Sequence, residues 1–356
     1  MTATERGHYF PAAGDSWERQ RPEDAGFDPD ALQAAVNFAL ANETTKGHYD
    51  RVDLSLPQND VVGPLKDKGP MHGLILRNGR IVTDWGNTAQ IDMTYSVAKS
   101  YLSTMAGLAL DDGLIRDVDD LVREYVPTEH FQGDHNGQIT WRMLLQQTSE
   151  WVGKLFDKND TADRRKGVDR EIQTPGTLYE YNDVRVNLLG FALLHVWRRP
   201  LPEVLKERVM DPIGGSDTWQ WHGYSTSYVD IDGKRMQSVS GGSHFGGGIW
   251  INSLDHARFG HLFLAGGNWN GRQLISEKWI AEATTPSACE PTYGYMWWLN
   301  PRRALYPSCP ENCFAAHGAG GNYIWISPDH GLVVVVRWLE GEHRDAFFGK
   351  VLAALR

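Results

Sequence analysis

One short segment combines a potential nucleophile with a potential base. Ser96-Val97-Ala98-Lys99 is the single S-x-x-K in the chain, and in a helix the side chain at position i+3 lies on the same face as the one at position i. A serine hydroxyl needs a neighbouring base before it can attack a carbonyl carbon, and burial favours the neutral amine of a lysine. Lys99 is therefore a candidate to activate Ser96. The alternative is structural, with Ser96 capping the helix and Lys99 reaching solvent.

Tyr181 is a second candidate for moving a proton. A Pro175-Gly176 turn precedes an aromatic run that reaches Tyr181 just before a predicted helix. A phenol close to a lysine ammonium can be held partly as phenolate and can act as a general base. The alternative is a tyrosine that only packs at the start of the helix.

A third segment, Phe314–Ile326, is rich in glycine (FAAHGAGGNYIWI). Glycines allow the edge of a strand to approach a ligand closely. A backbone N–H from this edge and the N–H of Ser96 at a helix start would together form an oxyanion hole. His317 lies in the segment, and three roles are open for it: a core or surface histidine, a substrate contact, or a proton donor.

Hydrophobic periodicity and capping residues predict the elements that must position these side chains. Helices are predicted at 28–41, 96–110, 140–147, 183–197, 202–209 and 346–355. Strands are predicted at 72–86, where a hairpin turns at Asn78-Gly79, and at 247–251, 323–327 and 332–338, where the last two turn at 328–331.

Strands at both ends of the chain with helices between them predict the α+β class: an antiparallel sheet flanked by helices, with an inserted, mostly helical lobe. We expect residues 1–110 and 241–356 to form the α/β lobe and residues 111–240 to form the helical lobe. The active-site cleft would lie between the two lobes of one catalytic unit.

Composition narrows the class of protein. The 356 residues are 41% hydrophobic and 22% charged, with a net charge of −10 and no basic stripe, which argues against nucleic acid or an anionic membrane as a partner. No apolar run approaches the roughly 18 residues of a membrane helix, and the N-terminus shows no secretory signal, so we expect a cytoplasmic protein. The oligomeric state stays open.

Two further features of the composition allow predictions. The basic run Arg164-Arg165-Lys166 is predicted to be a solvated loop. The three cysteines, Cys289, Cys309 and Cys313, are expected to be reduced and non-catalytic, and their spacing predicts no metal site. No metal or organic cofactor is expected.

The order and spacing of the three segments resemble the serine β-lactamase and penicillin-binding protein superfamily. Within it they resemble the branch related to class C β-lactamases, family VIII carboxylesterases and 6-aminohexanoate-dimer hydrolases. Ser96-Val97-Ala98-Lys99 matches the first motif of that superfamily, and Tyr181-Asn182-Asp183 matches the tyrosine of the second. The stretches at Ser240–Gly260 and Tyr293–Trp298 are also similar, and the likeness spans about residues 72–340. It implies that Ser96 is the nucleophile and that Lys99 and Tyr181 move its proton.

The sequence departs from that pattern in two places. Asp183 stands where the resemblance would place an asparagine, and an ionised carboxylate cannot donate a hydrogen bond. It could instead hold Lys99 by ion pairing, bind a substrate cation, or simply begin a helix in solvent. In the third motif we align the glycine of the family pattern with Gly318, which puts His317 at the middle position. The backbone N–H of Ala319 then lies in the oxyanion hole together with the backbone N–H of Ser96. The other register aligns His317 with the lysine of the motif.

The resemblance also implies a substrate site and a reaction. Its pocket would have an aromatic wall, and the implied substrate contacts are Asp183, His317, Gly318, Trp250 and Trp298. The implied function is a serine hydrolase, a carboxylesterase or amidase, which cleaves a small-molecule ester or amide through a Ser96 acyl-enzyme. The alternatives are a transacylase or amide synthetase on the same scaffold, a β-lactamase or D,D-peptidase, and a non-catalytic ligand-binding relative.

Overall fold

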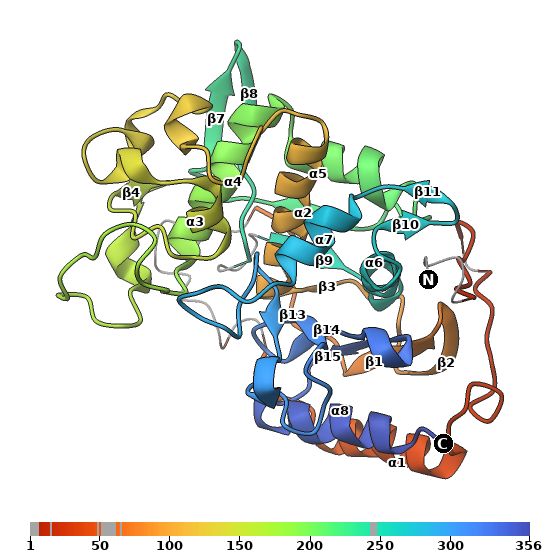
Figure 1. The fold of residues 1–356 in the computed structure, drawn as a ribbon. Coiled ribbons are helices and arrows are strands. Elements are labelled where there is room, and N and C mark those ends of the chain that lie inside the picture. The colour runs from red at the N-terminus through yellow and green to blue at the C-terminus, as the bar shows by residue number, and fades with distance from the viewer. Residues whose placement is uncertain (1–6, 15, 48–49, 51–61, 65, 243–247) are drawn as a thin grey trace.

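A six-stranded antiparallel sheet is built from strands at both ends of the chain (Figure 1). The computed structural model describes residues 7–14, 16–47, 50, 62–64, 66–242 and 248–356. The strand order is β12-β13-β14-β15-β1-β2. The bounds are β1 His72–Arg77, β2 Arg80–Trp85, β12 Trp298–Leu299, β13 Phe314–Gly318, β14 Asn322–Ser327 and β15 Leu332–Arg337. The predicted α+β class is confirmed.

The hairpin predicted at 72–86 is present, and its turn follows the expected chemistry. Asn78 and Gly79 both have positive φ, 48° and 89°. A two-residue turn with positive φ at both positions has the twist that antiparallel strands need. The predicted hairpin between β14 and β15 is also confirmed by their antiparallel register.

Helices cover both faces of the sheet (Figure 1). On one face, α1 (Pro29–Ala41) and α8 (Arg344–Ala353) lie side by side, and on the other lies α6 (Ser253–Leu264). All six residues of β15 are buried. Val334 and Val336 belong to the apolar cluster under α1 and α8, while Val333 and Val335 belong to the cluster that includes α2 and α6. The sequence of a central strand that is covered on both faces is a continuous apolar run, without the alternation of apolar and polar residues.

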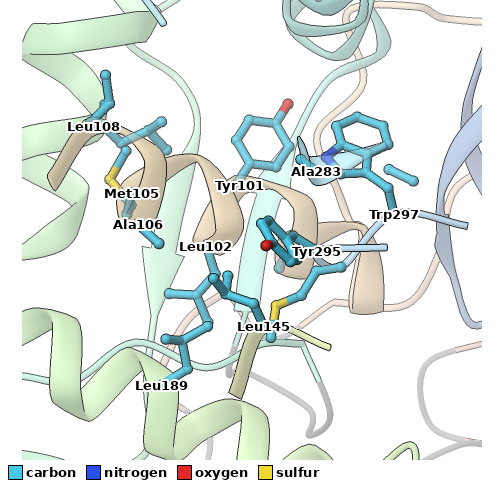
Figure 2. Packing of buried hydrophobic residues seen from close by; sticks show 14 of the residues in the cluster. Tyr101, Leu102, Met105, Ala106, Leu108, Leu145, Leu189, Ala283, Tyr295 and Trp297 are labelled. Atoms are coloured by element: carbon cyan, nitrogen blue, oxygen red, sulfur yellow. The ribbon is translucent and has the colours of Figure 1, made fainter. Parts of the chain in front are cut away.

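Helix α2 (Ala98–Asp111) runs through the centre of the molecule. Every residue from Ala98 to Ala109 is buried. Figure 2 shows its side chains among residues of α3 (Trp141–Leu145), α4 (Asp183–Trp197), α7 (Glu277–Ala283) and the segment at 295–297. A helix with small and apolar residues on all sides can pack in every direction. This packing holds the first turn of α2 rigidly, directly after the candidate nucleophile.

Most predicted helices are confirmed, with caps where expected. The side chains of Asp28, Thr140 and Asn182 accept N–H bonds at the starts of α1, α3 and α4. The helix predicted at 202–209 begins as α5 (Leu201–Leu205) and continues as a π-helical turn, Lys206–Met210. Helix α6 was not predicted, because five of its buried residues are polar and obscure its apolar stripe: Ser253, Asp255, His256, Arg258 and His261.

Smaller sheets complete the fold. β3 (Asp92–Met93), β9 (Gly248–Ile251) and β6 (Gln220–His222) form a three-stranded sheet that leads into the Ser96 region. Gly247, the predicted first residue of the strand at 247–251, lies outside the described residues. The remaining strands form three small hairpins: β4 Lys154–Leu155 with β5 Lys158–Asn159, β7 Tyr228–Ile231 with β8 Lys234–Gln237, and β10 Asn268–Trp269 with β11 Arg272–Gln273.

Among the described residues, the helices are all too short or too polar to cross a membrane. The cytoplasmic location and the division into two lobes with a cleft between them stay predictions.

The turn at Gly79 gives a test of the sheet's construction. A Cβ at Gly79 would lie 1.9 Å from the carbonyl oxygen of Tyr9, whereas at Gly113, which also has positive φ, no described atom lies within 4 Å of the same position. We expect Gly79→Ala to lower the free energy of unfolding by about 3 kcal/mol. The control Gly113→Ala should cost about 1 kcal/mol, from backbone strain alone. Urea denaturation measures both, and equal losses would contradict this description of the turn.

Candidate active site

Ser96 lies in a strained turn directly before α2. The turn is a 3₁₀ helix, Tyr95–Val97, and Tyr95 has φ of 50°, a region that bulky residues seldom adopt. Two contacts hold it: Tyr95 packs edge-on against Trp338, with ring centroids 6.5 Å apart, and a Cβ at Gly242 would lie only 2.0 Å from the Tyr95 carbonyl oxygen. Strain of this kind persists only where surrounding packing enforces it. The half-buried Ser96 is therefore presented in a fixed position.

Lys99 makes the contact with Ser96 that its spacing predicts. Its Nζ donates to Ser96 Oγ at 2.6 Å and to the carbonyl oxygen of Gly241 at 3.1 Å. The same Nζ lies 2.5 Å from Asp183 Oδ1, and the Lys99 side chain is only 2% exposed. Lys99 Nζ therefore makes two hydrogen bonds and one ion pair with these three oxygens.

Asp183, the first residue of α4, is the counter-ion of Lys99. Burial alone would push the pKa of this carboxyl up, but the Lys99 ammonium and the nearby Arg165 guanidinium bring the pKa below its ordinary value. Asp183 is thus an ionised carboxylate near neutral pH. Of the alternatives left open by the sequence, the structure supports ion pairing with Lys99.

Tyr181 joins the same cluster through its phenol. The phenol lies near enough to Ser96 for that residue to lower its pKa, and the ring centroid lies 4.8 Å from Lys99 Nζ. Burial raises the pKa of Tyr181, the negative charge of Asp183 raises it further, and the effect of Ser96 offsets only part of this. Tyr181 is therefore a neutral phenol near neutral pH. The structure thus favours the neutral phenol over the predicted partial phenolate, because burial and Asp183 raise the pKa of Tyr181 more than Ser96 and Arg165 lower it.

Buried charge pairs fix the loop that carries Tyr181. Glu150 and Glu180 have fully buried side chains. Arg170 donates to both oxygens of Glu150 at 2.6 Å and also pairs with Glu180, and Arg185 Nη1 lies 2.6 Å from Glu150 Oε1. Removing one partner of such a buried network leaves an uncompensated charge, which is strongly destabilising. The network therefore holds the residues on both sides of Tyr181.

Strand β13 approaches Ser96 from the other side. A Cβ at Gly318 would lie 2.2 Å from the carbonyl oxygen of Thr94 and 3.3 Å from the backbone nitrogen of Ser96. Only glycine fits at such a close approach of two backbones. Ala319 follows in the exposed turn between β13 and β14. This is the approach that the Gly318 register of the third motif requires.

One buried arginine connects the two halves of this backbone arrangement. Arg337 is fully buried and donates to the carbonyl oxygens of Asp92 and Met93, at 3.1 and 2.8 Å, on the segment that leads to Ser96. It also donates to Asn322 Oδ1 at 2.6 Å, and the Asn322 amide donates to the Ala319 carbonyl at 2.7 Å. Burial lowers the pKa of Arg337 to about 10, so its positive charge remains near neutral pH.

Aromatic rings line the site beside Tyr181. Trp298, on β12, stacks on the Tyr181 ring at a centroid distance of 5.7 Å, and its ring lies 5.8 Å from that of His317. His317 in turn stacks on Tyr323 at 4.5 Å. Burial lowers the pKa of His317 to about 3, so its imidazole is neutral near neutral pH. His317 is a packed, uncharged ring at the edge of the site.

Trp250 is not where the sequence analysis placed it. It is fully buried on β9, paired across the sheet with Met93, in a cluster with Met93, Tyr95 and Trp338. A fully buried ring offers no surface to a substrate, so the expected substrate contact is wrong. Trp250 instead supports the strained turn from behind.

The solvated loop predicted at 164–166 is also wrong in part. Arg164 is nearly buried and lies 2.7 Å from Asp160 Oδ2. Arg165 reaches the site: its guanidinium carbon lies 4.5 Å from the Tyr181 ring centroid and Nη2 lies 3.7 Å from Asp183 Oδ2. Neither Arg165 nor the Gly241 carbonyl was among the candidate site residues. A short basic run in a loop gives no signal that one of its arginines lies over the Tyr181 ring.

The mixed α/β fold with its antiparallel sheet is that of the β-lactamase-fold proteins. Residues 74–347 match the family described as Beta-lactamase. Because the match covers well over half of the chain, the protein belongs to the Beta-lactamase family, and the resemblance noted from the sequence is confirmed.

Individual relatives are distant. The chain is 22% identical over 270 residues to a Salmonella paratyphi A protein named "Putative D-alanyl-D-alanine carboxypeptidase", and the match covers 62% of this chain and 62% of that one. The chain thus spans less than two thirds of the length of the curated relatives it matches.

Two solved structures share the fold. One is titled "Putative 6-aminohexanoate-dimer hydrolase from Bacillus anthracis", with 16% identity, a TM-score of 0.62 and coverage of 90% of this chain and 93% of that one. The other is a D-stereospecific amidohydrolase from Streptomyces sp., with 17% identity, a TM-score of 0.59 and coverage of 92% and 98%.

Because of the buried charge network, the free energy of unfolding depends on pH through Glu150. Burial raises the pKa of this carboxyl, but the hydrogen bonds from Arg170, Gln173 and Arg185 bring the pKa down to about 2. A carboxyl whose pKa is lower in the folded state than in the unfolded state stabilises the fold at pH values above its unfolded pKa. This contribution is lost as the pH falls toward the folded pKa. We expect the free energy of unfolding to fall by on the order of 3 kcal/mol through Glu150 between about pH 5 and pH 2.

Urea denaturation across this pH range measures the effect. Glu150→Gln should remove this share of the pH dependence, and the control Glu171→Gln, at an exposed position of the same loop, should keep it. An unchanged pH dependence in Glu150→Gln would show that Glu150 is not held by the arginines as described.

Proposed function

We propose that this protein is a serine hydrolase that cleaves a small-molecule carboxylic ester or amide through an acyl-enzyme on Ser96. The observation that carries the proposal is the 2.6 Å contact between Lys99 Nζ and Ser96 Oγ. The proximity of the Tyr181 phenol to Ser96, which lowers the pKa of that phenol, and membership of the Beta-lactamase family support it. A serine hydroxyl with an amine and a phenol beside it is the arrangement that activation of a serine needs.

The charge states in the site suggest the proton route. At rest Lys99 and Asp183 are an ion pair and Tyr181 is a phenol, so none of the three is yet a free base next to Ser96. Transfer of one proton from Lys99 to Asp183 gives an amine and a carboxylic acid, and burial favours such an uncharged pair. The amine then takes the proton of Ser96 as Oγ attacks the carbonyl carbon.

The remaining steps return each proton. In the proposed sequence the Tyr181 phenol donates its proton to the leaving group and recovers one from Lys99, and Asp183 then returns its proton to Lys99. Water attacks the acyl-enzyme by the same route, so that Ser96 regains its proton. The oxyanion would be held by the N–H groups of Ser96 and Ala319, and losing one such donor costs about 10²–10³ in rate.

The site favours hydrolysis of an ester or amide over β-lactam recognition. Asp183 is engaged by Lys99 at 2.5 Å and, being ionised, offers no amide donor to an acylamino side chain. The stacked rings of Tyr181 and Trp298 suit an apolar group beside the scissile bond. We therefore rank a carboxylesterase or amidase first. A transacylase or amide synthetase on the same scaffold remains a proposal that product analysis with a competing amine would distinguish.

Replacement of the nucleophile tests the proposal. We expect wild type to react covalently with a fluorophosphonate probe and to hydrolyse p-nitrophenyl butyrate. Ser96→Ala should lose the label and at least about 10⁴-fold in kcat, because no other hydroxyl takes its place. Ser103→Ala is the matched control, since it removes a fully buried hydroxyl further along the same helix and should retain both activities. Probe labelling of a folded Ser96→Ala protein would overturn the assignment.

A further inference from the structure

A second functional group stands beside the reaction centre. Arg165 is the one member of the 164–166 run that lies over the Tyr181 ring, with its guanidinium carbon 4.5 Å from the ring centroid. Its side chain is 56% exposed, although it lies over the ring of the tyrosine whose phenol is near the nucleophile. The guanidinium therefore faces both solvent and the position where a substrate would sit.

The guanidinium retains hydrogen-bond donors for a ligand. Within the described part of the chain, the carboxylate near the Arg165 guanidinium is that of Asp183. Arg165 Nη2 lies 3.7 Å from Asp183 Oδ2, which is too long for a hydrogen bond. Asp183 is already engaged by Lys99 at 2.5 Å. An exposed, loosely placed ion pair contributes little to stability, so the contact with Asp183 does not account for the position of Arg165.

Most of the charged groups near Tyr181 and Asp183 are closely paired with each other. The charged groups that act on Tyr181 and Asp183 include three cations, Lys99, Lys158 and Arg165, and two carboxylates, Asp163 and Asp183. Lys158 is paired with Asp163 at 3.3 Å, and Lys99 is paired with Asp183. Arg165 is the cation of this group with the longest separation from its carboxylate, 3.7 Å to Asp183 Oδ2. Its exposed positive charge attracts an anionic group of a ligand.

We propose that Arg165 forms an anion subsite and that the substrate carries a carboxylate, bound by the Arg165 guanidinium, next to the ester or amide that Ser96 attacks. This inference rests on the proposed hydrolase function. A guanidinium binds a carboxylate through two parallel N–H donors, and the exposed side of Arg165 has room for such a contact. Arg165 thus selects among substrates and neither donates nor accepts the transferred proton.

A matched pair of esters tests the subsite. One is p-nitrophenyl butyrate, and the other is the mono-p-nitrophenyl ester of succinic acid, whose acyl chain has the same length but ends in a carboxylate. The readout is the ratio of kcat/KM for the charged ester to that for the neutral one. We expect this ratio to fall about tenfold in Arg165→Gln, mainly through KM, since a charge-assisted hydrogen bond to the substrate is lost. Arg165→Lys should restore part of it.

The control is Arg235→Gln, which removes another arginine that lies over a tyrosine ring, that of Tyr228 at 5.0 Å on the β7–β8 hairpin. It should leave the ratio unchanged. The wild-type ratio should also fall as salt is added, because an exposed charge is screened.

The outcomes separate the two proposals. If wild type hydrolyses both esters and Arg165→Gln keeps the wild-type ratio, the anion subsite is wrong and the hydrolase proposal stands. If wild type hydrolyses neither ester and takes no fluorophosphonate label, the hydrolase proposal is wrong, and the subsite falls with it.

Discussion

The buried ion pair between Lys99 and Asp183 is the constraint on which the site depends. Two charges withdrawn from water are tolerated only when each is paired and its remaining hydrogen-bonding capacity is met. Lys99 meets this condition through Asp183, Ser96 Oγ and the Gly241 carbonyl. Because Asp183 begins α4 and Lys99 lies in α2, the pair fixes these two helices against each other at the point where Ser96 emerges.

The rest of the structure supports that pair with further buried polar contacts. The Glu150, Arg170 and Arg185 network holds the loop that delivers Tyr181 and Asp183. On the opposite side, Arg337 links the segment before Ser96 to the turn at Ala319 through Asn322. A site assembled from distant segments keeps its geometry only when such connections are rigid, and the strained turn at Tyr95 shows that the surrounding packing is strong enough to impose it.

Local patterns predicted what depends on local geometry. The Asn78-Gly79 turn, the capped helices and the contact between Ser96 and Lys99 all follow from dihedral preferences or from helical spacing. The contacts that the sequence did not reveal are long-range. Arg337 meets Met93 from 244 positions away, and Trp250 is buried by strands and loops that periodicity cannot bring together. The neutral state of Tyr181 likewise depends on burial and on Asp183, which act only in the folded chain.

The role of Asp183 as the acceptor of the Lys99 proton is the central claim of this account, and the rate of covalent labelling tests it directly. The second-order rate constant of fluorophosphonate labelling at Ser96 should be compared in wild type, in Asp183→Asn and in the control Asp163→Asn, with folding checked by circular dichroism. The account predicts that Asp183→Asn slows labelling by about 100-fold, the lower range for loss of a proton-transfer partner, and that Asp163→Asn labels at nearly the wild-type rate. A folded Asp183→Asn protein that labels as fast as wild type would contradict it.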